Sequence, residues 1–74
     1  MRWIKFVDKN GGRRVFGNDE NGGVFYQRID GSWNRLNVKE HRYNRVEHFI
    51  TFLEDTFHLG VKGFEVTEHK GGWD

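Results

Sequence analysis

Short runs of alternating apolar and polar residues fill the first half of the chain, and clusters of turn-forming residues separate them. The runs are rich in aromatic and β-branched residues and predict strands at about residues 2–8, 13–17, 24–29 and 32–36. The turn clusters begin eleven residues apart, at Asp8, Asp19 and Asp30, and they contain the Asn-Gly and Asp-Gly pairs that favour tight hairpins. The pattern predicts a four-stranded antiparallel meander.

The periodicity changes after residue 37, where apolar residues recur at helical spacing. Six of them follow the i, i+3, i+4, i+7 rule and form one stripe: Tyr43, Val46, Phe49, Ile50, Leu53 and Phe57. We therefore predict a helix over about residues 38–59, with Asn37 and Glu40 forming a capping box at its start. Gly60 is suited to the left-handed conformation that ends a helix.

A last alternating run predicts a fifth strand over about residues 62–69, followed by a loose tail at 70–74. Because the helix reverses the chain, we expect the fifth strand to lie antiparallel to the first, in the order 5-1-2-3-4. Pairing at the edge of the fourth strand, or insertion elsewhere, is the alternative. The expected fold is one small α+β domain, residues 1–74, with one amphipathic helix packed on one face of the sheet.

The third turn assigns the neighbouring residues to the two faces of the sheet. A two-residue loop at 30–31 would turn Phe25, Ile29 and Leu36 toward the helix. The opposite face would then carry a ladder of aromatic and arginine residues, together with Val24: Tyr26, Arg28, Trp33 and Arg35. A sheet covered by one helix leaves its second face in water, so this ladder is predicted to be exposed.

Two interpretations of the ladder are open. Cation–π contacts and cross-strand pairing would stabilise the hairpin, whereas Trp, Tyr and Arg side chains are also enriched at binding hot spots. Trp3 and Phe16 extend the same patch unless a tail with Trp73 covers them. Phe52, about 120° from the centre of the helix stripe, is either covered by the chain end or an exposed anchor. The candidate binding residues are Trp3, Tyr26, Arg28, Trp33, Arg35 and Phe52.

Catalytic and metal-binding patterns do not fit the sequence. The chain has no Cys, and His41 and His48 stand about 10.5 Å apart along a helix, too far to share one ion. The Asp-rich turns lack the spacing of a calcium loop, and the Gly-Gly pairs lack the Lys-Ser or Lys-Thr of a phosphate loop. No Ser or Thr stands in a recognisable nucleophile setting. We therefore expect no enzymatic activity, no cofactor and no metal.

Charge adds a preference for the kind of partner. Lys and Arg number 12 against 11 Asp and Glu among 74 residues, but the net charge of +1 is a cancellation, because residues 1–45 carry +5 and residues 46–74 carry −4. Such polarity favours a complementary protein partner over bare nucleic acid. No apolar run is long enough for a signal peptide or a membrane span, so a cytoplasmic location without membrane contact is expected.

One short run bears a likeness to a known group of proteins. Gly63–Thr67, a strand directly after a helix in a very small protein, resembles the last strand of the inhibitors of host RNA polymerase made by T7-like phages. The resemblance covers five of the 74 residues; it implies a small inhibitory protein and assigns no functional residue.

Three functions remain as hypotheses. The leading one is a small non-enzymatic protein-binding module, an inhibitor or regulator of a larger host enzyme of the kind made by phages and mobile elements. The alternative is a single-stranded nucleic-acid-binding protein, with bases stacked on Tyr26 and Trp33 and phosphates at Arg28 and Arg35. The third is a homo-oligomer that pairs through the edge of the fourth strand.

Overall fold

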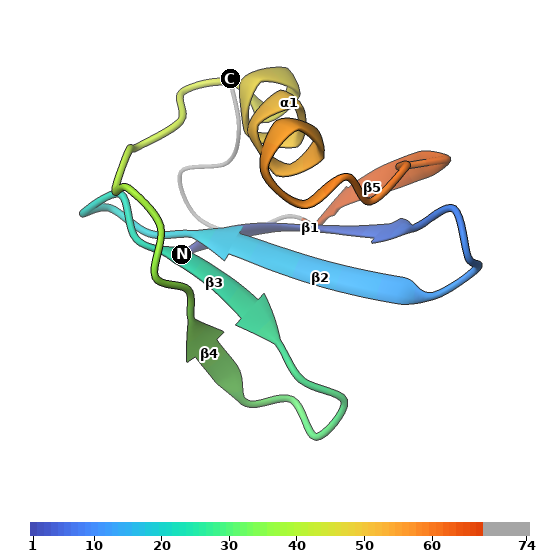
Figure 1. The fold of residues 1–74 in the computed structure, drawn as a ribbon. Helices are drawn as coiled ribbons and strands as arrows, with labels where there is room; N and C mark the ends of the chain where they lie inside the picture. Colours follow the sequence, from blue (N-terminus) through green and yellow to red (C-terminus); the bar gives the residue numbers. More distant parts are fainter. Residues whose placement is uncertain (68–74) are drawn as a thin grey trace.

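The computed structural model describes residues 1–67, with side chains described as far as Gly63. Within this part of the chain, five antiparallel strands form one sheet and one helix crosses one face of it (Figure 1). The elements are β1 Arg2–Val7, β2 Arg13–Asn18, β3 Val24–Gln27, β4 Trp33–Arg35, α1 Val46–Phe57 and β5 Gly63–Thr67. The strand order is β4-β3-β2-β1-β5, and β5 pairs antiparallel with β1, which confirms the predicted α+β class and strand order. The predicted end of the last strand and the tail, residues 68–74, lie outside the described residues.

The three hairpin turns share one geometry. In each turn a backbone hydrogen bond joins a residue to the residue four positions later, so the loop between them has three residues. The third loop residue is a glycine with positive φ: 81° at Gly11, 88° at Gly22 and 91° at Gly31. A three-residue hairpin loop of this kind combines a type I turn with a left-handed residue, a conformation that glycine adopts without steric penalty.

The carboxylate of Asp8 fastens the first turn. Its Oδ1 accepts backbone N–H groups of Asn10 and Gly12 at 2.9 and 2.8 Å, and its Oδ2 accepts the Nε–H of Arg14 at 2.9 Å. The side chain is only 3% exposed. The hydrogen bond from Arg14, followed by that from Gly12, holds the pKa of Asp8 below its ordinary value because both favour the charged carboxylate.

The lowered pKa of Asp8 predicts a specific sensitivity to acid. Its folded pKa lies below the unfolded value of about 3.9, so the stabilisation is complete above that value and is lost as the pH falls through the folded pKa. We expect the melting temperature of the wild type to fall more steeply below about pH 4 than that of Asp8→Asn. Thermal unfolding followed by circular dichroism between about pH 2 and pH 7 measures this.

Glu20→Gln provides the control, because Glu20 is an exposed acid at the second turn. It should keep the acid sensitivity of the wild type. If Asp8→Asn loses stability in acid as steeply as the wild type does, the proposed role of Asp8 is wrong.

Pairing between β3 and β4 differs by one residue from the sequence-based expectation. Arg28 N–H donates to Ser32 O at 2.8 Å and closes a three-residue loop, where a two-residue loop was predicted. The pairs are therefore Gln27↔Trp33, Tyr26↔Asn34 and Phe25↔Arg35. Because alternate residues of a strand face opposite sides, β3 turns over: Val24 and Tyr26 face the helix, and Phe25 does not.

The same difference corrects two predicted core positions, Phe25 and Ile29, and leaves the third, Leu36, intact. Ile29, predicted to be in the core, stands fully exposed in the β3–β4 loop, with a relative exposure of 106%. Leu36 packs against the core as predicted. Phe16 of β2, predicted on the opposite face, faces the core because it pairs with Ile4, and it is only 4% exposed.

The helix is shorter than predicted, because residues 37–45 form a segment without helix or strand, which we call the strap. The strap passes beside the β2–β3 turn before it reaches α1 (Figure 1). His41 N–H donates to Gly22 O at 2.9 Å and Tyr43 N–H donates to Asn18 Oδ1 at 3.0 Å, so these two amides are committed to partners outside a helix. The predicted capping box at Asn37 and Glu40 does not form; Arg45 precedes the first turn instead, without a side-chain cap.

The end of the helix also comes earlier than predicted. His58, and not Gly60, follows its last residue, in the left-handed conformation with φ of 54°, and its N–H donates to Glu54 O at 2.9 Å. This hydrogen bond satisfies one carbonyl of the final turn.

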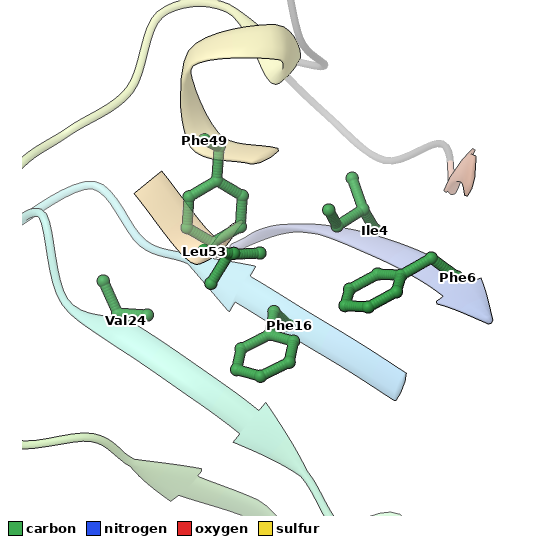
Figure 2. Packing of buried hydrophobic residues seen from close by; sticks show 6 residues of the cluster. All are labelled: Ile4, Phe6, Phe16, Val24, Phe49 and Leu53. Carbon is green, nitrogen blue, oxygen red and sulfur yellow. The ribbon is translucent and has the colours of Figure 1, made fainter. Parts of the chain in front are cut away.

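The core lies between the sheet and α1 (Figure 2). The fully enclosed apolar residues, all at most 4% exposed, come from β1, β2, β3 and α1: Ile4, Phe6, Phe16, Val24, Phe49 and Leu53. Five members of the predicted helix stripe are confirmed on α1, because Phe49 and Leu53 belong to this cluster and Val46, Ile50 and Phe57 pack around it. Tyr43, predicted on the helix, packs against the cluster from the strap instead. With few aliphatic residues to bury, the core depends on large rings such as the stacked pair Phe6 and Phe16, 5.8 Å apart.

Candidate functional site

The six candidate binding residues divide between the two sides of the sheet. On the face opposite α1, which we call the open face, lie Trp3, Trp33 and Arg35. On the helix side lie Tyr26, Arg28 and Phe52. The predicted ladder of four residues on one face is therefore wrong for Tyr26 and Arg28, and the open face keeps Trp33 and Arg35.

Tyr26 and Arg28 have structural partners on the helix side. The Tyr26 ring packs against Phe16, with ring centroids 5.4 Å apart, as part of the core margin. The Arg28 guanidinium donates to Asn34 Oδ1 at 2.9 Å, and Asn34 is the cross-strand neighbour of Tyr26. These contacts follow from the three-residue loop, which moves every residue of β3 to the other side.

Phe52 is partly buried between the helix and the strap. Its ring stacks on Phe49 at 6.4 Å with an interplanar angle of 8°, and it meets the Tyr43 ring at 5.4 Å. The strap therefore covers part of Phe52, which is neither a core residue nor a fully exposed anchor. The cover that was predicted from the chain end lies outside the described residues.

Two tryptophans meet across the open face. Trp3 on β1 and Trp33 on β4 have ring centroids 6.4 Å apart in an edge-to-face arrangement of 62°, although β2 and β3 separate their strands. Gly17 on β2 makes this possible: a Cβ at that position would lie 3.3 Å from the Trp33 ring, and Met1 also lies over it. The Trp33 side chain thus reaches over a gap left by glycine, and Gly17 is buried beneath it.

A third ring, predicted to lie in the core, belongs to this surface. Phe25 faces the open side, and the Arg35 guanidinium lies 5.8 Å from its ring centroid. The same guanidinium forms an ion pair with Glu40 of the strap. Cation–π contact and ion pair together hold Arg35 across the ring, which limits its freedom before any partner arrives.

The rest of the open face is a mixture of aliphatic and cationic residues. By alternation along β1, β2 and β3, these are Lys5, Val7, Arg13, Val15 and Gln27. Val7 is 42% exposed, one of three large apolar residues that are exposed in the described part of the chain. Trp3, Phe25 and Trp33 are half-buried, so all three rings retain surface that a partner could cover.

The described residues contain no cluster of three or more His, Asp or Glu side chains that would hold a metal ion. No helix among them is long and apolar enough to cross a membrane. Asp30 is, besides Asp8, the other described carboxylate with a lowered pKa, because it accepts hydrogen bonds from Ser32 within the β3–β4 turn. The feature that stands out chemically is therefore the aromatic open face.

Comparison of the chain with protein families, with curated protein sequences and with solved structures found no match.

Proposed function

We propose that this protein is a non-enzymatic binding module that docks on a partner protein through its open face. The observation that carries the proposal is the group of three half-buried rings, Trp3, Phe25 and Trp33, on the side of the sheet that the helix leaves uncovered. In keeping with the small size of the chain, we propose that docking regulates or inhibits a larger enzyme.

The geometry of the rings suits an interface. Trp side chains offer large rigid contact areas with few rotatable bonds, and they dominate binding energy where water is excluded around them. Trp3 and Trp33 already hold each other in place, and Arg35 is fixed over Phe25, so little conformational entropy remains to be lost on binding.

Charge favours a different protein over a second copy of this chain. Arg13 and Arg35 lie on the open face, and an arrangement of two copies face to face would bring these like charges together. Lys5 lies there too, but Glu65 of β5 is its cross-strand neighbour. An acidic surface around an apolar centre complements the face instead. We therefore propose a partner that carries carboxylates opposite Arg13.

Replacing Trp33 with alanine tests the docking surface. Capture of the partner from host lysate by immobilised protein, quantified by mass spectrometry, is expected to fall at least tenfold, the equivalent of about 1.4 kcal/mol. Phe52→Ala, the loss of a half-buried ring on the helix side, should leave capture unchanged. Arg13→Glu should weaken capture and Lys62→Glu, an exposed lysine after α1, should not.

Circular dichroism and melting curves of each variant separate lost binding from lost folding. Capture that survives in folded Trp33→Ala but not in folded Phe52→Ala would place the docking surface on the helix side and contradict the proposal.

Single-stranded nucleic acid is the second candidate for the same face, because three rings and the cations Lys5 and Arg13 lie together there. Its contacts would involve Trp3 and Trp33, and not Tyr26 or Arg28 as first predicted. The edge-to-face arrangement of the tryptophans and the exposed Val7 favour a protein. Titration of the protein with mixed oligonucleotides at low salt distinguishes the two partners. Under our proposal the oligonucleotides quench no Trp fluorescence.

A further inference from the structure

A second surface feature lies on the helix side of the molecule. The strap and α1 border an open hollow of about 350 Å³, within the range of roughly 300–1,000 Å³ that is usual for small-ligand sites. The residues that line it are Lys39, His41 and Tyr43 from the strap and Phe52 from α1. The three strap residues that line the hollow alternate along the chain.

Aromatic rings form the wall of the hollow. Tyr43 and Phe52 lie with centroids 5.4 Å apart and planes inclined by 38°, and the His41 ring meets Tyr43 edge to face at 4.6 Å. Burial raises the pKa of Tyr43, so its phenol is uncharged at neutral pH. Such a wall accepts a flat apolar group.

The rim of the hollow is cationic. Lys39 is exposed, and no ion pair among the described residues involves it. The strap contains one acid, Glu40, which pairs with Arg35 and is not among the residues that line the hollow. A negatively charged group bound beside Lys39 and His41 would therefore meet hydrogen-bond donors, and no carboxylate of the strap would repel it.

We propose that this hollow binds a nucleoside monophosphate, with the base against Phe52 and Tyr43 and the phosphate at Lys39 and His41. A phosphate carries about −1.5 to −2 charges at neutral pH and three acceptor oxygens, which matches two adjacent donors better than a carboxylate does. Base–aromatic stacking contributes about 1–3 kcal/mol per base. Because the hollow is open, we expect a Kd on the order of 1 mM.

Nuclear magnetic resonance titrations of the isotope-labelled full chain test this site. AMP is expected to shift the signals of residues 39–43 and 52 in a saturable way, and both adenosine and inorganic phosphate should bind at least tenfold more weakly. Lys39→Ala should remove the advantage of AMP over adenosine. Arg42→Ala, an exposed neighbour that does not line the hollow, should preserve it.

The variant Phe52→Leu tests the contact between the base and the ring. It should weaken the binding of AMP and of adenosine to the same extent. The test does not depend on that variant being folded, because Lys39 is exposed and its replacement leaves the core untouched. Equal binding of AMP and adenosine, shifts reproduced by inorganic phosphate alone, shifts centred outside the hollow, or no saturable shift by about 10 mM would each overturn the proposal.

Discussion

Replacing Asn18 with alanine is expected to lower the free energy of unfolding by about 3 kcal/mol. Asn18 is fully buried at the end of β2 and ties the strap to the sheet. Its Oδ1 accepts the Tyr43 N–H at 3.0 Å and an Arg2 N–H at 3.3 Å, and its Nδ2 donates to His41 O at 3.0 Å and Gly23 O at 3.2 Å. Alanine leaves the strap groups without these partners in a site that water reaches poorly.

This loss is a large share of the stability of so small a protein. At about 0.05–0.15 kcal/mol per residue, the whole chain has roughly 4–11 kcal/mol. A loss of about 3 kcal/mol corresponds to a decrease in melting temperature of about 12–24 °C. Thermal and urea unfolding measure it, and faster hydrogen exchange of the His41 and Tyr43 amides would locate the damage in the strap.

Asn34→Ala is the matched control. Asn34 is a half-buried asparagine of β4 that accepts one hydrogen bond, from Arg28 at 2.9 Å, and its loss should amount to at most about 1 kcal/mol. If Asn18→Ala is no less stable than Asn34→Ala, the strap is not held by Asn18 and the prediction is wrong.

The strand order and the helix stripe could be predicted because local signals determine them. Turn residues mark the hairpins, apolar periodicity marks the helix face, and chain reversal by the helix makes β5 antiparallel to β1. None of these steps requires knowledge of a distant contact.

Which residues of β3 point toward the helix was predictable in principle, and the error in that prediction has an identifiable source. The Asp30-Gly31 pair is typical of a two-residue loop, and that loop length set the predicted register. In the structure the three turns share the glycine with positive φ and the Asn or Asp before it, so that Asp30 corresponds to Asn10 and not to Asp8. Aligned this way, the third loop begins after Arg28 and has three residues. The change moves Tyr26 to the core margin and Phe25 to the open face.

The start of the helix was not predictable from local pattern. Tyr43 continues the apolar stripe, and Asn37 with Glu40 has the spacing of a capping box, so the local sequence favours a helix from residue 38. The strap forms instead because Gly22 and Asn18, which are distant in sequence, accept hydrogen bonds from its backbone at His41 and Tyr43. Tertiary contacts of this kind override propensity and leave no periodic signal. The hollow at Phe52 depends on the strap and was equally beyond sequence reasoning.

Replacing Gly22 with alanine is expected to be at least as damaging as replacing Asn18, with a loss of about 3–4 kcal/mol. Part of the loss arises from the backbone, because Gly22 has a φ of 88°. The remainder is steric: a Cβ at Gly22 would lie 2.8 Å from the backbone nitrogen of His41 and 3.0 Å from its carbonyl carbon. Backbone atoms cannot rotate away as a side chain can, so the strap must move and its hydrogen bond to Gly22 O is lost.

Gly11→Ala separates the two contributions. Gly11 occupies the equivalent position of the first turn with a φ of 81°, and a Cβ there would meet nothing within 4 Å. Its replacement should therefore lose only the conformational part, about 1–2 kcal/mol. Urea unfolding measures the loss in both variants, from the shift of the midpoint when the dependence of the free energy on urea concentration is unchanged. Equal losses at the two glycines would show that the strap yields without a penalty.

The double variant Gly22→Ala with Asn18→Ala tests whether both residues act on the same segment. If each single change releases the strap, the second adds little once the first is present, and the combined loss is smaller than the sum by about 0.5–3 kcal/mol. Gly11→Ala with Asn18→Ala should be additive, because the first turn has no contact with the strap in the hydrogen bonds of the described residues. Additivity in both pairs would contradict a strap held jointly by Gly22 and Asn18.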